Sequence, residues 1–352
     1  MIQENVLIYG AYGYTGKLIV ALAVKKGYRP TIGGRDEGKT KELARQYNLP
    51  YHVLDCKNQQ AWDNALKDKE LLLNCAGPFS LTIKDILPAC LRNKVHYLDI
   101  TGEVDVFDYV SSFDEDAKKA GITLIPGTGF DVVPTDCLAV FLKQQLPDAT
   151  HLELAFDSQS GLSRGTALSV LNRFHQGSAS RKNGVIVPNK TASVSKTINY
   201  GGKDRLSVGI AWGDIFTAYH STGIPNIEVF TGMPPKMLKT MRKASKFGWL
   251  IKTWVVQQIL RKVIRNKISG PSNEKRENLR TYLWGKVTNA NGKEVIAELE
   301  TPESYKLTAI TALLCAEGVL KGGVKSGYTT PAEAFGPDFI MKVDSVNRAI
   351  KN

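Results

Sequence analysis

A glycine-rich stretch near the start of the chain constrains its fold more than any other feature. The sequence GAYGYTG at residues 10–16 follows an apolar run at 6–9 and precedes a segment in which apolar side chains recur at helical spacing. A strand, a glycine turn and a helix in this order form the context of a dinucleotide-binding turn. Gly10 permits a tight exit from the strand, Gly13 lets the backbone approach a pyrophosphate, and Gly16 lets the helix pack close to the sheet. The amide groups and the dipole at the start of the helix would hold the phosphates.

Two other interpretations of this stretch compete with a dinucleotide site. Glycine turns also serve as plain structural connections between a strand and a helix, and the sequence leaves that alternative open. A phosphate loop of the nucleotide-hydrolase type needs glycine at position 11 and Ser or Thr at position 18. The chain has Ala11 and Leu18 at these positions, so the phosphate-loop interpretation fails.

From residue 5 to about residue 135, strand-like and helix-like stretches alternate. This alternation predicts an α/β fold, a Rossmann-type doubly wound parallel sheet with helices on both faces. Ligands of such sheets bind beyond the carboxyl ends of the strands, so the residues that follow each strand are candidates for the site. The predicted strands are 5–10, 30–34, 51–54, 70–75, 95–98 and 122–126, and the predicted helices include 37–47, 59–68, 81–93 and 105–120.

The residues after the second strand indicate which dinucleotide is bound. The sequence reads Gly-Gly-Arg35-Asp36, with Lys39 close behind. An acidic residue at this strand end usually meets a free ribose 2′-hydroxyl, whereas an arginine meets a 2′-phosphate. Because Arg35 comes first, we favour NADP(H) over NAD(H). Two alternatives remain: Arg35 as an ordinary surface residue, and Asp36 as a ribose acceptor if the turn is shifted by one residue.

Further cofactor contacts are expected after the third and fourth strands. Asp55 and Cys56 follow the third strand and are placed to touch the adenine end. The fourth strand ends in small residues and a proline, which leave room for the nicotinamide ribose; an ordinary strand-to-helix turn is the alternative. These residues are Cys75, Ala76, Gly77 and Pro78.

Reduction of a C=C or C=N bond also needs a proton donor or a charge stabiliser near the substrate. Tyr97, Asp99 and Asp131 lie where the fifth and sixth strands end, on turns that should face the nicotinamide. They are therefore the candidate catalytic residues. The competing interpretation is structural, because Asp99 and Asp131 could bond to backbone amides of their glycine-rich turns.

Five motifs taken together resemble a known family. They are GAYGYTG at 10–16, GGR at 33–35, NCAGPF at 74–79, YLDITGE at 97–103 and PGTGFDVVPTD at 126–136. In this order they resemble the saccharopine dehydrogenase-like oxidoreductases, and most closely the trans-acting enoyl reductase branch. The segments at 301–313 and 327–336 resemble the C-terminal signature of the same family, whereas the middle of the chain is only loosely covered.

The resemblance implies a Rossmann domain that binds NADP(H), a second α/β domain, and last helices that return to the first domain. The cofactor contacts that it implies are Gly10, Tyr12, Gly13, Tyr14, Thr15, Gly16, Arg35, Ala76, Gly77 and Pro78. One departure concerns the substrate. Saccharopine-forming enzymes of the family carry an Asp-His pair in the last turn, where this chain has Asp136-Cys137.

The expected boundaries follow from these patterns. We expect residues 1–135 to form the NADP-binding domain, completed by the C-terminal helices 303–352, and residues 136–302 to form a second domain for the substrate or for dimerisation. The second domain should contain a mixed or antiparallel sheet, because strand-like segments recur through it and Asn291-Gly292 is a hairpin signal between the last two. A homodimer is an open alternative to a monomer.

Cysteine usage and hydropathy suggest the compartment. The five cysteines stand alone, without CxxC pairs, and indicate reduced thiols. No basic-then-apolar leader precedes the first strand, and no run of 18 apolar residues occurs. We therefore expect a cytoplasmic protein, with peripheral attachment to a membrane as an alternative. No grouping of histidines and cysteines predicts a metal site.

The positive charge is concentrated in one segment. The chain has a net charge of +12, and residues 236–286 alone carry 14 Lys and Arg against 2 Asp and Glu. Within it, residues 236–267 combine basic flanks with an apolar stretch in which Phe247, Ile251, Val255, Ile259 and Val263 recur at every fourth position. Three interpretations compete: a helix buried on the second domain, a helix docked on an anionic membrane or lipidic partner through Trp249 and Trp254, and a nucleic-acid surface. We expect no nucleic-acid partner, because no nucleic-acid motif accompanies the charge.

Two classes of function follow from the sequence. The first is an NADP(H)-dependent oxidoreductase that reduces the C=C (enoyl) or C=N bond of a small apolar or lipid-like substrate, which would place it in lipid metabolism. The second is a non-catalytic NADP-binding scaffold or sensor associated with a membrane or lipid, since a fold does not fix a function.

Overall fold

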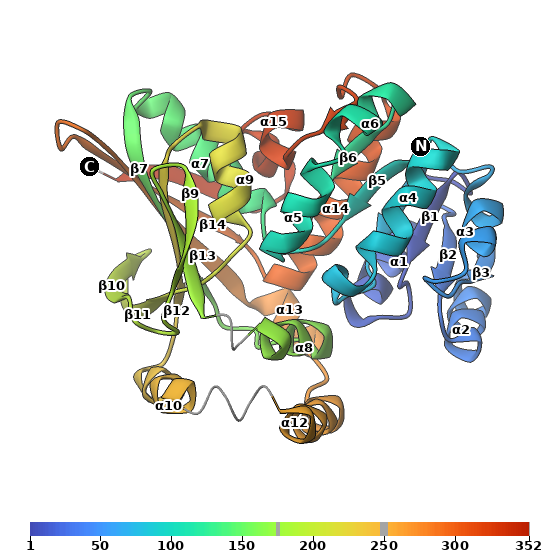
Figure 1. Ribbon diagram of the computed structural model, residues 1–352, viewed down its shortest axis with the longest axis horizontal. Helices are drawn as coiled ribbons and strands as arrows, with labels where there is room; N and C mark the ends of the chain where they lie inside the picture. Colours follow the sequence, from blue (N-terminus) through green and yellow to red (C-terminus); the bar gives the residue numbers. More distant parts are fainter. Residues whose placement is uncertain (174–176, 247–252, 352) are drawn as a thin grey trace. The chain divides into compact units, whose positions relative to one another are not determined.

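The computed structural model describes residues 1–173, 177–246 and 253–351 (Figure 1). The chain forms two compact units. The first comprises Met1–Val133 and Tyr305–Phe335, and the second comprises Pro134–Ser304 and Gly336–Asn352. Phe247, Trp249 and Ile251, which belong to the predicted apolar stretch, lie outside the described residues.

The first unit contains a seven-stranded sheet in the order β15-β6-β5-β4-β1-β2-β3. Every pairing in this sheet is parallel. The predicted doubly wound parallel sheet is therefore confirmed. Its strands are β1 (Val6–Tyr9), β2 (Thr31–Gly34), β3 (Tyr51–Val53), β4 (Leu71–Asn74), β5 (His96–Asp99), β6 (Thr123–Ile125) and β15 (Gly327–Tyr328).

The central strands form the core of this unit because both of their faces are covered. All four residues of β1 are buried, as are all four of β4, and such strands read as continuous apolar runs in the sequence. The helices that connect and cover the sheet are α1 (Tyr14–Lys25), α2 (Glu37–Tyr47), α3 (Gln59–Leu66), α4 (Ile83–Asn93), α5 (Val104–Ser111), α6 (Asp114–Ala120), α14 (Ser304–Leu320) and α15 (Pro331–Phe335), with a 3-10 turn η1 at Phe79–Leu81.

The single helix predicted at 105–120 is two helices, α5 and α6. The break falls at Ser112 and Phe113. The hydroxyl of Ser111 donates to the carbonyl of Asp108 at 2.8 Å, and that of Ser112 donates to the carbonyl of Tyr109 at 2.7 Å. Serine side chains that bond back to the preceding turn compete with the helical backbone, which favours termination here.

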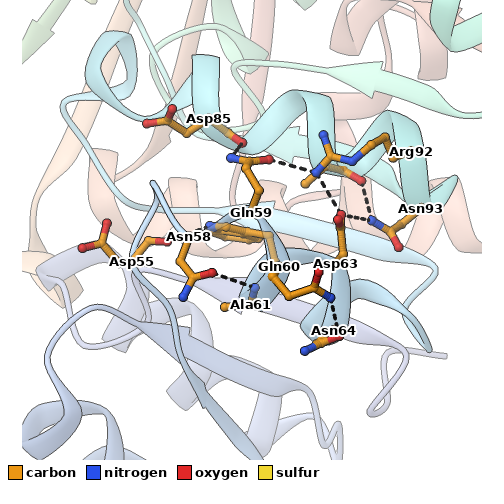
Figure 2. Close-up of polar contacts among 12 residues, drawn as sticks. Asp55, Asn58, Gln59, Gln60, Ala61, Asp63, Asn64, Asp85, Arg92 and Asn93 are labelled. Atoms are coloured by element: carbon orange, nitrogen blue, oxygen red, sulfur yellow. Dashed lines mark hydrogen bonds and ion pairs between the residues drawn. The ribbon is translucent and has the colours of Figure 1, made fainter.

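Polar contacts join α3 to α4, as Figure 2 shows. Arg92 donates to Asp63 and to Gln59, both at 2.9 Å, and Gln59 in turn donates to the carbonyl of Asp85 at 3.0 Å. Asn93 adds a bond of 2.8 Å to Asp63. These contacts fix two helices that lie after β3 and β4, and so they hold the loops at the carboxyl edge of the sheet.

The second unit contains a nine-stranded mixed sheet (Figure 1). Its main path runs β10-β11-β12-β7-β13-β14-β16, with β8 and β9 beside β12. The pairing of β12 with β7 is parallel, whereas the others are antiparallel. The strands are β7 (Ala149–Ser158), β8 (Ser178–Lys182), β9 (Val185–Asn189), β10 (Ser195–Tyr200), β11 (Lys203–Gly209), β12 (Asn226–Gly232), β13 (Arg280–Asn289), β14 (Glu294–Pro302) and β16 (Asn347–Lys351).

One face of this sheet is covered by α7 (Val133–Gln145). Burial alternates residue by residue along β13, and a Cβ atom at Gly285 would lie 2.6 Å from Leu142 and 3.1 Å from Leu138 of α7. The glycine therefore permits close packing of the helix on the strand. The other helices of the unit are α8 (Arg164–Arg173), α9 (Asp214–Thr222), α10 (Pro235–Lys246), α12 (Trp254–Lys267) and α13 (Asn273–Asn278), with a 3-10 turn η3 at Phe339–Lys342.

The end of the chain differs from the expectation that 303–352 completes the first domain. Only Tyr305–Phe335 belongs to the first unit, and Gly336–Asn352 belongs to the second. The reason is that β16 pairs with β14 as an edge strand, while the guanidinium of Arg348 stacks 3.7 Å from the centre of the Phe141 ring on α7. Residues expected to be helical therefore extend the second sheet.

Candidate functional site

The glycine turn lies where the first unit's sheet reverses its strand order, between β1 and β4. Gly10 has a φ of +76°, and a Cβ atom there would lie 2.7 Å from the amide nitrogen of Ala76. A Cβ atom at Gly16 would lie 2.4 Å from the carbonyl oxygen of Gly10. Only glycine fits at either position, so the turn and the first helical turn of α1 are held against each other.

Gly13 has a different environment from the other two glycines. It precedes α1 with an ordinary φ of −64°, and the single close approach for an added Cβ is the Gly10 carbonyl oxygen at 3.0 Å. Among the described residues, no side chain caps α1 and its first turn carries no acidic residue. The amide groups and the helix dipole thus favour an anion at this end, which is what a bound pyrophosphate requires.

Tyr12 connects the glycine turn to the end of β2. Its hydroxyl accepts a hydrogen bond of 3.2 Å from the amide of Asp36, and a Cβ atom at Gly34 would lie 2.3 Å from its ring. The glycine of the GGR motif therefore makes room for the Tyr12 ring. The family resemblance implies that Tyr12 contacts the cofactor, but it does not show this packing.

Arg35 is exposed at the end of β2. Asp36, by contrast, caps α2: its carboxylate accepts from the Lys39 amide at 3.0 Å and pairs with the Lys39 ammonium at 3.0 Å. The bond from the Lys39 amide is the main cause that holds the pKa of Asp36 below its ordinary value. Since both carboxylate oxygens are engaged, the alternative in which Asp36 accepts from a ribose hydroxyl is disfavoured.

The end of β3 carries Asp55 and Cys56 next to two aromatic side chains. The Tyr9 hydroxyl donates to the carbonyl of Leu54 at 3.0 Å and lies 3.3 Å from the Cys56 sulfur. The Trp62 ring meets the Tyr9 ring edge-on at 4.8 Å and donates to the carbonyl of Asp55 at 3.2 Å. Asp55 is exposed, and its side chain points away from the α3–α4 contacts in Figure 2. Burial raises the pKa of Cys56, which favours the neutral thiol.

The loop after β4 is fixed by polar side chains. Asn74 accepts from the amide of Ala76 at 3.0 Å, and the Thr82 hydroxyl donates to the carbonyl of Ala76 at 3.1 Å. The Glu103 carboxylate accepts from the amides of Phe79 and Ser80 at 3.0 and 3.1 Å. Cys75 and Ala76 are half-buried, Gly77 is exposed, and the Gly77–Pro78 peptide bond is cis. Glu103, which the sequence reasoning missed as a site residue, thus joins the loops after β4 and β5.

Tyr97 and Asp99, two of the three predicted catalytic residues, are fully buried. The Tyr97 hydroxyl accepts from Asn74 at 3.1 Å and donates to the Asp99 carboxylate at 2.8 Å. The other Asp99 oxygen accepts from the amides of Thr101 and Gly127, both at 2.9 Å. Burial, the largest cause, raises the pKa of Asp99 to about 6. This geometry favours the structural interpretation of both residues, because their polar atoms face the core and the two adjoining turns.

Asp131 is the remaining candidate and is only half-buried. Its carboxylate lies against Gly102, where an added Cβ would come within 2.6 Å. Burial and, second, the charge of Glu103 raise the pKa of Asp131 to about 7. A carboxyl group with such a pKa is protonated in part at neutral pH and can act as a general acid.

The turn that carries Asp131 is held by α14, which sequence reasoning did not include in the site. The Thr308 hydroxyl accepts from the Phe130 amide at 3.0 Å, and the Thr311 hydroxyl donates to the Thr128 carbonyl at 2.8 Å. The Tyr305 ring on the same helix meets the Tyr14 ring edge-on at 5.0 Å. The threonines of the 301–313 motif were the available signal, since they recur on one face of a helix.

A parallel sheet with the order 3-2-1-4-5-6 and a glycine turn at its switch point defines a dinucleotide-binding Rossmann domain. Residues 6–125 match the family model described as the saccharopine dehydrogenase NADP binding domain. The first unit is thus similar to the NADP-binding domain of saccharopine dehydrogenase, and the cofactor that it binds is NADP(H). The residues present fit NADP(H), because Arg35 is exposed at the end of β2 and side chains at Gly10 and Gly16 would clash with neighbouring backbone.

Relatives in other organisms match part of this chain. The lipid droplet localized protein of Caenorhabditis elegans is 26% identical over 168 residues, which cover 44% of this chain and 39% of the relative. The saccharopine dehydrogenase-like oxidoreductase of mouse is 24% identical over 162 residues, or 40% of this chain and 38% of the relative. The trans-acting enoyl reductase of Mycobacterium leprae is 25% identical over 142 residues, or 38% of this chain and 34% of the relative. The matched region thus spans less than two fifths of each relative.

A solved structure is similar to the whole chain. Apo histidine-tagged saccharopine dehydrogenase (L-Glu forming) from Saccharomyces cerevisiae matches with a TM-score of 0.70, at 15% identity, with all of both chains covered. At this identity the similarity shows the fold alone. It confirms the mixed α/β class of a Rossmann domain with a second sheet domain.

Proposed function

We propose that this protein is an NADP(H)-dependent oxidoreductase that reduces a C=C or C=N bond of a small apolar substrate. The observation that supports it best is the combination of a cofactor cradle, formed by the glycine turn and Arg35, with one carboxyl group, Asp131, whose pKa lies near neutrality. NADPH supplies the hydride when it is bound. The predicted contact residues after β1, β2, β3 and β4 are proposed to hold NADPH, with Arg35 at the 2′-phosphate.

The protein's own contribution to the proposed reaction is binding, orientation and a proton. The amide groups at the start of α1 bind the diphosphate. Glu103 fixes the loop at the nicotinamide end by accepting hydrogen bonds from the backbone amides of Phe79 and Ser80. Asp131 is proposed to donate a proton from its carboxyl oxygen to the substrate. Tyr97 and Asp99 position the turns after β5 and β6, and they do not react.

We also propose that the substrate is lipid-like and that residues 236–267 contact a membrane peripherally. The supporting observations are the amphipathic, basic character of that segment and the names of two relatives, one localised to lipid droplets and one an enoyl reductase. A homodimer formed through the second unit stays a prediction.

The test is NADPH oxidation by the full chain with a panel of enoyl thioesters and imines, combined with calorimetric binding of NADPH. Turnover of at least one panel member that is lost in Asp131→Asn supports the proposal. Tight NADPH binding together with complete inertness across the panel contradicts it and favours the non-catalytic NADP-binding scaffold.

A further inference from the structure

Helix α12 presents apolar side chains to solvent along its length. Val255, Ile259 and Val263, spaced four residues apart, are 58%, 56% and 44% exposed, and Trp254 at the start of the helix is 74% exposed. Among the residues described in α12, none is buried. The interpretation as a helix buried on the second domain is therefore wrong for Trp254–Lys267.

A different face of α12 contacts the protein. Figure 1 shows α12 next to α8, and the two helices are in contact. Arg261 donates to the side chain of Asn172 on α8 at 2.6 Å, while Val256, Leu260 and Ile264 are half-buried. The apolar face of α12 is thus broad: its row Val256, Leu260 and Ile264 is half-buried, and the adjacent row Val255, Ile259 and Val263 faces water.

Helix α10, the neighbouring basic helix, uses its apolar side chains differently. Leu238 is 3% exposed and packs with Ala192 and Val208. Arg242 donates to the carbonyl of Ala192 and to the hydroxyl of Ser195, both at 3.0 Å. Helix α10 exposes one large apolar side chain, Met237 (52%), whereas α12 exposes four, namely Trp254, Val255, Ile259 and Val263.

The charged side chains of α12 are all basic. Helix α12 contains Arg261, Lys262, Arg265 and Lys267 and no acidic residue, and residues 236–267 contain ten basic residues and no acidic one. Lys262, Arg265 and Lys267 are exposed beside the stripe. A second copy of the same surface would meet it with like charge, which opposes self-association through this face.

An anionic lipid surface fits both properties. Amphipathic helices lie in the plane of the interface, with apolar side chains entering about 5–10 Å and basic side chains attracted to anionic headgroups. Each Lys or Arg near such a surface contributes favourably and is screened by salt. A nucleic acid would use the positive charge but would leave the aliphatic stripe in water. The 14 residues of α12 span about 21 Å. Among the described residues, no helix has both the length and the apolar character needed to cross a bilayer.

We propose that α12 is a docking helix for anionic lipid surfaces, with Val255, Ile259 and Val263 as the inserting stripe and Lys262, Arg265 and Lys267 as the headgroup contacts. This inference rests on the membrane contact proposed above and narrows it to α12, and a vesicle-binding experiment without NADPH or substrate tests it separately from the reductase activity. A bilayer or the surface of a lipid particle would present the same chemistry.

The experiment is flotation of the full chain with vesicles of phosphatidylcholine, with or without phosphatidylglycerol. We expect binding only when the anionic lipid is present, and loss of binding when salt is raised to about 1 M, where the Debye length falls to about 3 Å. The double variant Ile259→Ser/Val263→Ser should lower the vesicle partition coefficient about tenfold, and Lys262→Glu/Arg265→Glu at least about tenfold.

The matched control is Val185→Ser, which removes an equally exposed valine (66%) from β9 of the same unit. It should bind vesicles as the wild type does, and all variants should keep the wild-type circular dichroism, since the changed side chains are exposed. Equal binding by wild type and both α12 variants would overturn the proposal. So would tighter binding to duplex DNA than to anionic vesicles, or a dimer in sedimentation that only the α12 variants dissolve. Emulsified droplets coated with the same lipids distinguish a particle surface from a bilayer.

Discussion

The hydroxyl of Tyr97 donates a hydrogen bond of 2.8 Å to the carboxylate of Asp99 inside the first unit, and both side chains are fully buried. Asp99 in turn binds the amide of Gly127, so the pair joins the ends of β5 and β6. A buried carboxylate is tolerated when its oxygens are fully hydrogen-bonded. Tyr97 and Asp99 thus lie at the carboxyl edge of the sheet, and their hydrogen bonds hold the turns that follow β5 and β6.

Tyr97→Phe should destabilise the protein without removing cofactor binding. The substitution leaves the Asp99 carboxylate and the Asn74 amide without their shared hydroxyl, which should lower the free energy of unfolding by about 1–3 kcal/mol. Urea denaturation measures this loss, and calorimetry at low temperature should find NADPH affinity unchanged. Tyr51→Phe is the control, because Tyr51 is 38% exposed on β3. A stable Tyr97→Phe protein that has lost turnover would point to a catalytic role instead.

Gly13→Ala and Gly16→Ala should separate cofactor binding from folding. A methyl group at position 16 would lie 2.4 Å from the Gly10 carbonyl oxygen, and such overpacking costs about 1–3 kcal/mol or more. A methyl group at position 13 meets only a tight approach of 3.0 Å, so the fold should persist while NADPH affinity falls at least about tenfold, or about 1.4 kcal/mol. Thermal unfolding and calorimetry on both variants measure the two effects. NADPH affinity of wild-type strength in Gly13→Ala would contradict the proposed diphosphate cradle.

Arg35→Ala should weaken NADPH binding far more than NADH binding. Hydrogen bonds between charged groups contribute about 1.5–3 kcal/mol, so we expect a loss of about 10- to 100-fold in NADPH affinity. Arg45→Ala removes another exposed arginine from α2 and should leave both affinities unchanged. Equal losses for the two cofactors would show that Arg35 does not contact the 2′-phosphate.

The first unit could be predicted closely because its strands are buried on both faces. Strands such as β1 and β4 read as uninterrupted apolar runs followed by glycine or small residues, a pattern that needs no tertiary information. The turn residues after these strands were predicted for the same reason. The packing of Tyr12 on Gly34 and the bonds of Glu103 to the β4 loop were not predictable, because they join segments distant in sequence.

Other features were missed although a local signal was present. The hairpin of β8 and β9 turns at Asn183-Gly184, which have φ values of 48° and 80°, and Asn-Gly is a strong hairpin signal.

The strand β16 had no such signal, because Asn347–Lys351 is short, polar and exposed, and it becomes a strand only by pairing with β14. The burial of Tyr97 and Asp99 could not be predicted either, because the sequence at the end of a strand does not show on which face its side chains lie.

Asp131→Asn should remove a pH dependence that the wild type shows. Burial and the charge of Glu103 raise the pKa of Asp131 to about 7 from an ordinary value of 3.8. If this carboxyl group donates the proton, turnover falls as pH rises through about 7 in the wild type. The asparagine variant should be slower by about 10²–10⁴-fold and should show a flatter profile, with NADPH affinity unchanged. Asp116→Asn, at an exposed position on α6, is the control and should keep the wild-type profile.

The raised pKa of Asp131 also makes the free energy of unfolding depend on pH, with or without a substrate. Because the folded state holds the proton more tightly than the unfolded state, Asp131 contributes stability that is fully present below about pH 3.8 and is lost as pH rises through about 7. The free energy of unfolding of the wild type, measured against Asp131→Asn by urea denaturation, should therefore decline across this window. Subtraction of the variant removes the contribution of Asp99, whose pKa is also raised. A difference that stays constant from pH 4 to pH 8 would mean that Asp131 is ionised normally, and it would remove this residue as the proton donor.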